Sequence, residues 1–305
     1  MRPLAHINPD HLTVGVSPPG IPPGIPGFDA VRSQASTENF PVALRLLPRT
    51  ARADLLAVYG FARLADEIGD RFVGDRLAAL DWLEHELDAA ATGQATHPAV
   101  SALTGTIERH ELNLDLFRDL IEANRRDQHQ HRYATFDDLL DYCRQSANPI
   151  GRLVLAIFGV VDPDLARLSD DVCSGLQVAE HLQDVGEDMT AGRVYLPQDD
   201  LARFGCTDED LRQPSADAAV RRLIACEAER ARALLGSGRQ LVAGLRMPAR
   251  LAVAGFVAGG LATLDAVAAA GFDVLGRRCR PTRRGVAGHA VRLLTRRPTA
   301  PSVSR

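Results

Sequence analysis

The chain has 305 residues, 46% of them hydrophobic, and a formal net charge of -4. This length allows a single helical domain with a large core, and the negative charge argues against a general nucleic-acid binder. All 35 basic residues are arginines, which excludes chemistries that need a Schiff-base lysine or a P-loop lysine.

The first segment in chain order, residues 1–35, is predicted to be disordered. It contains SPPGIPPGIPG, from Ser17 to Gly27, and so many prolines and glycines cannot sustain a helix. It lacks the charged stretch and continuous apolar run of a signal peptide, so we expect no export. Five cysteines, an odd number without a CxxC pair, are typical of reduced thiols. We therefore predict a cytoplasmic protein.

Residues 36–290 are predicted to form one all-α domain. Ala, Leu, Arg, Asp and Glu dominate the sequence and aromatic residues make up only 5%, which favours helices over sheets. We expect roughly nine or ten helices up to about residue 275. They are expected to break at Gly74, Gly93, Pro98, Gly159 with Pro163, Pro197, Pro214, Gly236 with Gly238, and Pro248.

The most apolar run is Leu251–Leu264, and it is predicted to be a buried core helix. It is about 14 residues long before Asp265 interrupts it, shorter than the roughly 20 residues that cross a bilayer. The chain is expected to end in a basic tail, residues 291–305. The arginines between Arg277 and Arg297, with no acidic residue among them, indicate either a solvated surface or contact with an anionic membrane.

A first candidate site lies on the helix predicted around residues 59–70. At about 100° per residue, Tyr59, Arg63, Asp66 and Asp70 fall within about a 60° arc of one helix face. Apolar residues flank this polar stripe on both sides. Such a stripe is either solvated or buried for a purpose.

A second stripe is more acidic: Glu180, Asp184, Glu187 and Asp188 share about a 100° arc of another predicted helix. Like charges at this spacing destabilise a helix by roughly 0.2–0.5 kcal/mol per pair, so a cation is expected to offset them. Either motif alone would be weak, because chance gives roughly five acidic i,i+4 pairs in such a composition. Two acidic faces set in apolar sequence are harder to explain as solvated surface.

The cation that these stripes favour is Mg²⁺. Carboxylate oxygens without neighbouring His or Cys suit this hard ion, which bridges one or two carboxylates to a substrate's phosphates. The two helices are therefore expected to clamp a diphosphate, whose departure as pyrophosphate the metal ions would assist. Zinc is not indicated, because the histidines form no HExxH or similar frame.

These residues resemble the two signatures of the squalene/phytoene synthase family over about residues 36–290. The matching motifs are Tyr59-x-x-x-Arg63-x-x-Asp66-Glu67-x-x-Asp70, Gln177 with Asp184-Val-Gly-Glu187-Asp188, and Gly192-Arg193-Val-Tyr195-Leu-Pro197. The resemblance implies an isoprenoid-synthase fold with a central cavity, two or three Mg²⁺ ions and an isoprenoid diphosphate substrate.

The resemblance also implies a role for each matching residue. Metal would be bound by Asp66, Asp70, Glu180, Asp184 and Asp188, the family usually carrying asparagine in place of Glu180. Diphosphate would be bound by Arg63 and Arg193, and the cavity would be lined by Phe40, Tyr59, Tyr142 and Gln177. Aromatic faces there would stabilise carbocations, and a dry cavity would delay quenching by water.

Two segments, Glu38–Ala43 with Leu46–Pro48 and Tyr142–Gly151, resemble the hydroxysqualene synthases of bacterial hopanoid pathways. That branch converts presqualene diphosphate and water to hydroxysqualene without NADPH. A helix break is expected before Pro149, and Asn148 at this break would hold the attacking water. Coupling to other hopanoid-pathway enzymes and peripheral contact with the membrane would follow from the insoluble substrate.

Two other interpretations stay open. A phytoene- or dehydrosqualene-type synthase would condense two prenyl diphosphates head-to-head, and product length would distinguish it from a hydroxysqualene synthase. A catalytically silent relative would act as a scaffold. The complete acidic motifs argue against the scaffold, because buried carboxylates without metal would only destabilise the fold.

Overall fold

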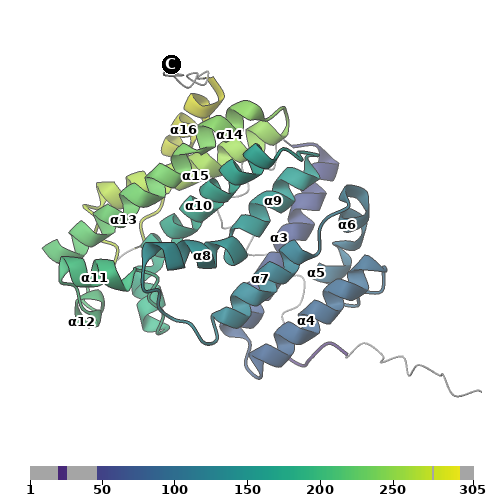
Figure 1. The fold of residues 1–305 in the computed structure, drawn as a ribbon, viewed down its shortest axis with the longest axis horizontal. Helices are drawn as coiled ribbons and strands as arrows, with labels where there is room; N and C mark the ends of the chain where they lie inside the picture. The colour runs from purple at the N-terminus through teal and green to yellow at the C-terminus, as the bar shows by residue number, and fades with distance from the viewer. Residues whose placement is uncertain (1–19, 26–46, 277, 296–305) are drawn as a thin grey trace, which may run out of the picture.

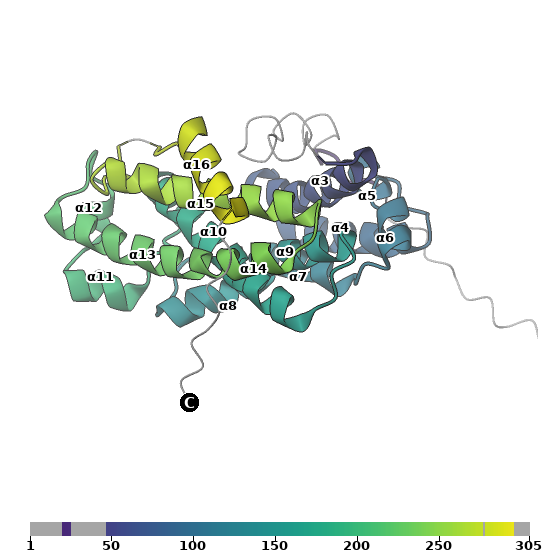
Figure 2. The ribbon, with the colours of Figure 1, turned by 90° about the horizontal axis from the view of Figure 1, so that it is seen from above.

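The computed structural model describes residues 20–25, 47–276 and 278–295, and every regular element within them is a helix. In this part of the chain the strand-like pairing is limited to an isolated bridge between Arg132 and Val194. The prediction of an all-α protein is confirmed. The helices pack side by side, with α4 to α6 toward one end of the molecule and α11 and α12 toward the other (Figures 1 and 2).

The helices fall into two groups along the chain. The first half contains α3 (Arg49–Arg71), α4 (Arg76–Ala91), α5 (Pro98–Ser101), α6 (Thr104–His110), α7 (Asp115–Arg126), α8 (Phe136–Ser146) and α9 (Asn148–Ile157). The second half contains α10 (Pro163–Thr190), α11 (Gln198–Phe204), α12 (Asp208–Leu211), α13 (Ala218–Gly236), α14 (Gly238–Gly244), α15 (Ala249–Ala269) and α16 (Arg283–Thr295).

The expected glycine and proline breaks lie at helix boundaries or between helices. Pro163, for example, is the first residue of α10, where its missing N–H needs no partner. The Asp162 carboxylate before it accepts hydrogen bonds from the Asp164 and Leu165 amides at 2.9 and 3.3 Å. The break before Pro149 is also confirmed, because Ala147 leaves helical geometry between α8 and α9.

The predicted number and extent of helices were wrong. The described residues contain fourteen helices, and α16 begins beyond the predicted end near residue 275. Short helices such as α5 and α12, with 4 residues each, carry too little periodicity to be recognised in a sequence. The expected boundary at residue 290 falls inside α16, whereas the boundary at residue 36 and the segment 1–19 lie outside the described residues.

Helix α15 contains the apolar run and belongs to the core. It has 21 residues, so its length alone would allow it to cross a membrane, and the argument from a short run was wrong. However, 61% of its apolar window is buried inside the protein. It packs against α10, α13, α14 and α16, which accounts for its apolar surface. The prediction of a buried core helix is confirmed.

The long helix α10 is the centre of the fold. It packs against α8, α9, α13, α14 and α15, while α3 packs against α4, α5, α7 and α9. Helices α7, α8 and α9 lie between α3 and α10. Helices α7 and α9 contact α3, and helices α8 and α9 contact α10. The two acidic stripes therefore lie on helices that the chain separates by more than 90 residues and that a shared set of neighbours brings together (Figure 1).

Candidate active site

The first acidic stripe lies in the C-terminal half of α3, facing α7. The Asn124 side chain of α7 donates a hydrogen bond to the Asp66 carboxylate at 3.4 Å. The helices can approach this closely because residue 69 is glycine: a Cβ there would lie 2.1 Å from the Asn124 Oδ1. Gln128 reinforces the contact by donating to the Gly69 carbonyl at 3.0 Å. The glycine of the first motif therefore serves helix packing next to the carboxylates.

Arg63 lies one turn before Glu67 on α3, and the two side chains form an ion pair. Its Nη2 donates to the Glu67 carboxylate at 2.6 Å, and Arg71 donates to the same oxygen at 3.1 Å. Glu67 is buried, so it fixes both arginines on this side of the helix. Tyr59, one turn before Arg63 on α3, is half-buried.

The second acidic stripe occupies the last turns of α10. Glu180 is exposed, whereas Asp184 and Asp188 are half-buried. The Asp184 Oδ2 accepts a hydrogen bond from Arg278 at 3.0 Å. Gly186 makes room for the segment that carries this arginine, because a Cβ there would lie 2.9 Å from the Leu275 carbonyl oxygen. Arg278, assigned from the sequence only to a basic surface, thus reaches the second motif.

Arg193 joins the two stripes. Its Nη1 donates to the Asp70 Oδ1 of α3 at 2.5 Å, and its Nη2 lies 3.9 Å from the Asp188 Oδ1 of α10. Asp70 and Asp188 both occupy the last turn of their helices, where the helix dipole disfavours a negative charge. The fold therefore concentrates negative charge at the ends of α3 and α10, and the positive Arg193 guanidinium lies between Asp70 and Asp188.

Burial and like charges raise the pKa values of Asp66, Asp184 and Asp188. Solvent reaches Asp66, yet the surrounding protein desolvates it and Asp70 repels its charge, which together raise its pKa to about 7. Desolvation, followed by the charges of Asp184 and Asp70, raises the pKa of Asp188 to about 7 against the opposing effect of Arg193. Desolvation also raises the pKa of Asp184. Without bound cations, these groups hold their negative charge at a cost.

An aromatic cluster lies beside Arg193 and consists of Tyr133, Tyr142, Tyr195 and His181. The His181 and Tyr195 rings stack with centroids 3.7 Å apart, and the Tyr142 and Tyr195 centroids are 5.8 Å apart. Burial and the charge of Arg193 lower the pKa of His181 to about 3, so its ring is neutral at physiological pH. Gln177, one turn before His181 on α10, places its side-chain nitrogen 3.3 Å from the His181 Nε2.

Asp127, directly after α7, is a carboxylate that the sequence did not reveal. Its Oδ2 accepts a hydrogen bond from the Tyr142 hydroxyl at 2.6 Å, while its Oδ1 is buried without a partner among the described residues. Desolvation raises its pKa to about 6, even though Tyr142 and Arg193 favour its charged form. No motif surrounds Asp127 in the sequence, so only the tertiary contact with Tyr142 identifies it.

Asn148 is set apart from the acidic stripes. It begins α9, it is buried, and its Oδ1 accepts a hydrogen bond from the Ser174 hydroxyl of α10 at 3.0 Å. Ser174 lies one turn before Gln177, so Asn148 faces the same helix as the aromatic cluster. Phe40, the remaining predicted site residue, lies outside the described residues.

The carboxylates of the two stripes suit a Mg²⁺ site that is completed by phosphates and waters, and among the residues that the structure describes they do not form a closed site made of protein ligands only. Within the described residues, one set of three side chains can place its ligand atoms within 4.8 Å of one another, and it contains none of the motif aspartates. The Asp184 Oδ1 is buried without a hydrogen-bond partner in the described part of the chain. Mg²⁺ binds such separated carboxylate oxygens when phosphates and waters complete its coordination.

The fold and the site define a class: an all-helical protein in which two helices bring acidic stripes together beside an arginine. Comparisons with known proteins are in agreement. A model of the squalene/phytoene synthase family matches residues 33–285, so the chain belongs to this family. Its members are isoprenoid synthases that act on isoprenoid diphosphates and generally depend on a divalent metal. The chain is therefore an enzyme, and the scaffold interpretation is set aside.

Individual members of the family are similar to this chain over most of its length. The hydroxysqualene synthase of Zymomonas mobilis is 37% identical over 205 residues, which cover 65% of this chain and 67% of the relative. The phytoene synthase of Arthrospira platensis is 34% identical over 210 residues, 64% of this chain and 68% of the relative. The crystal structure of squalene synthase HpnC from Alicyclobacillus acidocaldarius superposes with a TM-score of 0.72 at 46% identity, over 84% of this chain and 95% of that chain.

Proposed function

We propose that this enzyme converts presqualene diphosphate and water into hydroxysqualene and pyrophosphate, without NADPH. The observation that carries the diphosphate chemistry is the Asp70–Arg193–Asp188 bridge at the ends of two helices. The choice of reaction is supported by the 37% identity to a hydroxysqualene synthase. In this reaction the carbon–oxygen bond to the diphosphate breaks, its electron pair leaves with pyrophosphate, and water later forms a new carbon–oxygen bond and loses a proton.

The acidic stripes would hold two or three Mg²⁺ ions through Asp66, Asp70, Glu180, Asp184 and Asp188. When bound, these ions would neutralise the negative charge that develops on the departing pyrophosphate. Arg63 and Arg193 would bind the diphosphate oxygens directly, since guanidinium groups form paired hydrogen bonds with phosphates. Because Arg193 pairs with Asp70, substrate would compete with this carboxylate for the same donor.

The aromatic cluster would face the organic cation. Tyr142 and Tyr195 offer ring faces that would attract a positive charge. Tyr195 lines a narrow hollow with Arg193, and the Tyr142 ring centroid lies 5.8 Å from that of Tyr195. A neutral His181 adds no repelling charge there. Asn148 is our candidate for positioning the attacking water, with Ser174 fixing its carboxamide.

The test supplies purified enzyme with presqualene diphosphate and Mg²⁺ in heavy-oxygen water, without NADPH, and analyses the extracted lipid by mass spectrometry. We expect hydroxysqualene that carries the heavy oxygen. Asp66→Asn should abolish the product, while Asp137→Asn, a control at an exposed position on α8, should retain it. Absence of any product from presqualene diphosphate would overturn the proposal.

The runner-up is a phytoene- or dehydrosqualene-type synthase, favoured by the 34% identity to a phytoene synthase. Parallel incubations with farnesyl or geranylgeranyl diphosphate distinguish the two. Condensation of these substrates, with no turnover of presqualene diphosphate, would assign the enzyme to the runner-up.

Peripheral membrane contact and coupling to other hopanoid-pathway enzymes also stay proposals. Arg283, Arg284 and Arg292 are exposed on α16 and could meet an anionic surface. Flotation with anionic and neutral vesicles tests this contact, and equal behaviour with both vesicle types would argue against it.

A further inference from the structure

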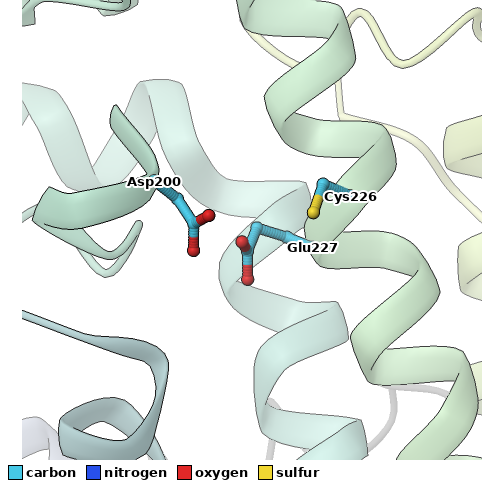
Figure 3. A group of neighbouring side chains, drawn as sticks. All are labelled: Asp200, Cys226 and Glu227. Carbon is cyan, nitrogen blue, oxygen red and sulfur yellow. The ribbon is translucent and has the colours of Figure 1, made fainter. Parts of the chain in front are cut away.

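A second group of side chains that could hold a metal ion contains none of the carboxylates of the two acidic stripes. It consists of Asp200 on α11 and of Cys226 and Glu227 on α13 (Figure 3). Each can place one ligand atom so that all three atoms lie within 4.8 Å of one another. Asp200 and Glu227 are 2% and 1% exposed, whereas Cys226 is half-buried and gives access from the surface.

The charge of this group is only partly compensated by the protein. The Arg230 Nη1 binds the Asp200 Oδ2 and also donates to the Glu227 Oε1 at 2.9 Å. The Asp200 Oδ1 has only long contacts, to the Arg230 Nη2 at 3.4 Å and to the Arg203 Nη1 at 3.5 Å. Arg203 is largely exposed, so it offsets little of the charge. Two buried carboxylates thus share essentially one half-buried guanidinium.

One buried ligand atom has no partner. The Glu227 Oε2 makes no hydrogen bond within the described residues, although the residue is almost fully buried. The Glu227 carboxylate points toward that of Asp200 rather than away from the group (Figure 3). A buried carboxylate oxygen without a partner is costly, so it requires either a proton shared with Asp200 or an additional bound group beside it.

We propose that Asp200, Cys226 and Glu227 bind one borderline divalent cation of the Zn²⁺ or Co²⁺ type. A thiolate with two carboxylates prefers such ions, whereas Mg²⁺ takes oxygen ligands only. With the thiolate, two carboxylates and Arg230, a divalent ion brings the net charge of the group to zero. The ligand atoms lie within 4.8 Å of one another and would have to close by up to about 1.5 Å to reach tetrahedral spacing. This site is independent of the proposed reaction.

Arg230 would orient the carboxylates of Asp200 and Glu227 for the metal ion and would not displace it. It binds the Asp200 Oδ2 and the Glu227 Oε1, makes only a long contact to the Asp200 Oδ1, and leaves the Glu227 Oε2 for the ion. Its guanidinium also lies 4.8 Å from the centroid of the Phe136 ring, which fixes its position. The ion would connect α11 to α13. Glu227 also lines a narrow hollow with Asp188, Arg193 and Tyr195, so the ion would stiffen a wall of the candidate active site.

The test uses the full chain, treated with chelator and then titrated with Co²⁺ in the presence of excess Mg²⁺ and a phosphine reductant. Mg²⁺ occupies the oxygen-only sites, and a thiolate-to-cobalt charge-transfer band reports the cysteine. We expect this band to saturate at one equivalent, Zn²⁺ to remove it, and Zn²⁺ to raise the melting temperature. Cys226→Ser should abolish the band, and Asp200→Asn should weaken Co²⁺ binding at least about tenfold.

Cys206→Ser is the matched control, because Cys206 is another free cysteine near the end of α11 and should leave the band intact. Circular dichroism shows whether each variant is folded, and Asp200→Asn tests the site with every cysteine retained. Absence of the band in the native protein, or its survival in folded Cys226→Ser, would overturn the proposal. In the first case the group is only an ion pair that shares a proton.

Discussion

Replacing Asp188 by asparagine should stabilise the metal-free protein at neutral pH while abolishing catalysis. Desolvation and the neighbouring carboxylates raise the pKa of Asp188 from 3.8 to about 7. Between about pH 4 and pH 7 the folded protein therefore holds a proton that the unfolded chain has released. This carboxyl contributes a destabilisation that grows as the pH rises through this range and is complete above it. Asparagine keeps the shape and removes the ionisation.

The size of the effect follows from the pKa difference. About 3 pH units at 1.36 kcal/mol per unit give an upper bound of about 4 kcal/mol. Solvent reaches 16% of the Asp188 side chain, so screening reduces the effect. We expect a gain of about 1–2 kcal/mol at pH 8, which raises the melting temperature by roughly 2–6 °C.

The assay compares melting temperatures with chelator at pH 5 and pH 8 for the native protein, Asp188→Asn and Glu187→Gln. Glu187 occupies the same turn of α10 but is exposed, so its variant controls for a change of charge alone. The advantage of Asp188→Asn should shrink at pH 5, and Mg²⁺ should stabilise the native protein more than the variant. Equal melting temperatures of the native protein and Asp188→Asn at pH 8 would refute this account of the site.

Three further changes test separate contacts. Arg193→Gln should lower kcat about 100- to 1,000-fold, since it removes a charged donor to the leaving group; a near-native kcat in steady-state assays would exclude that role. Tyr142→Phe leaves the Asp127 carboxylate without its 2.6 Å hydrogen bond and should destabilise the protein by about 1–3 kcal/mol in urea titrations. Gly186→Ala places a Cβ about 2.9 Å from the Leu275 carbonyl oxygen and should cost about 1–3 kcal/mol, measured in the same way.

The sequence was sufficient for the all-α class and for the two helices that carry the motifs. Helix periodicity placed Asp66 and Asp70 on one face and Asp184 and Asp188 on another, and both segments are helical in the structure. Glycine and proline marked the helix boundaries because their backbone restrictions act locally. One-turn helices were missed, since so few residues show no usable period. Helix α16, with 13 residues, was missed because its segment was interpreted only as a basic surface.

Only the tertiary structure decided which groups meet. The pairing of Arg193 with Asp70, of Arg278 with Asp184 and of Tyr142 with Asp127 joins residues from different helices or loops. The glycines of both motifs likewise acquire their purpose only when α7 and the segment around Leu275 lie against them.

What the sequence by itself determined is the local order: which residues form helices, and which side chains share a helix face. These properties depend on neighbours within about one or two turns along the chain. The tertiary structure decided the pKa values, the ion pairs across helices and the grouping of Cys226 with Asp200 and Glu227. Such properties depend on burial and on distances in space, which the packing of the helices sets.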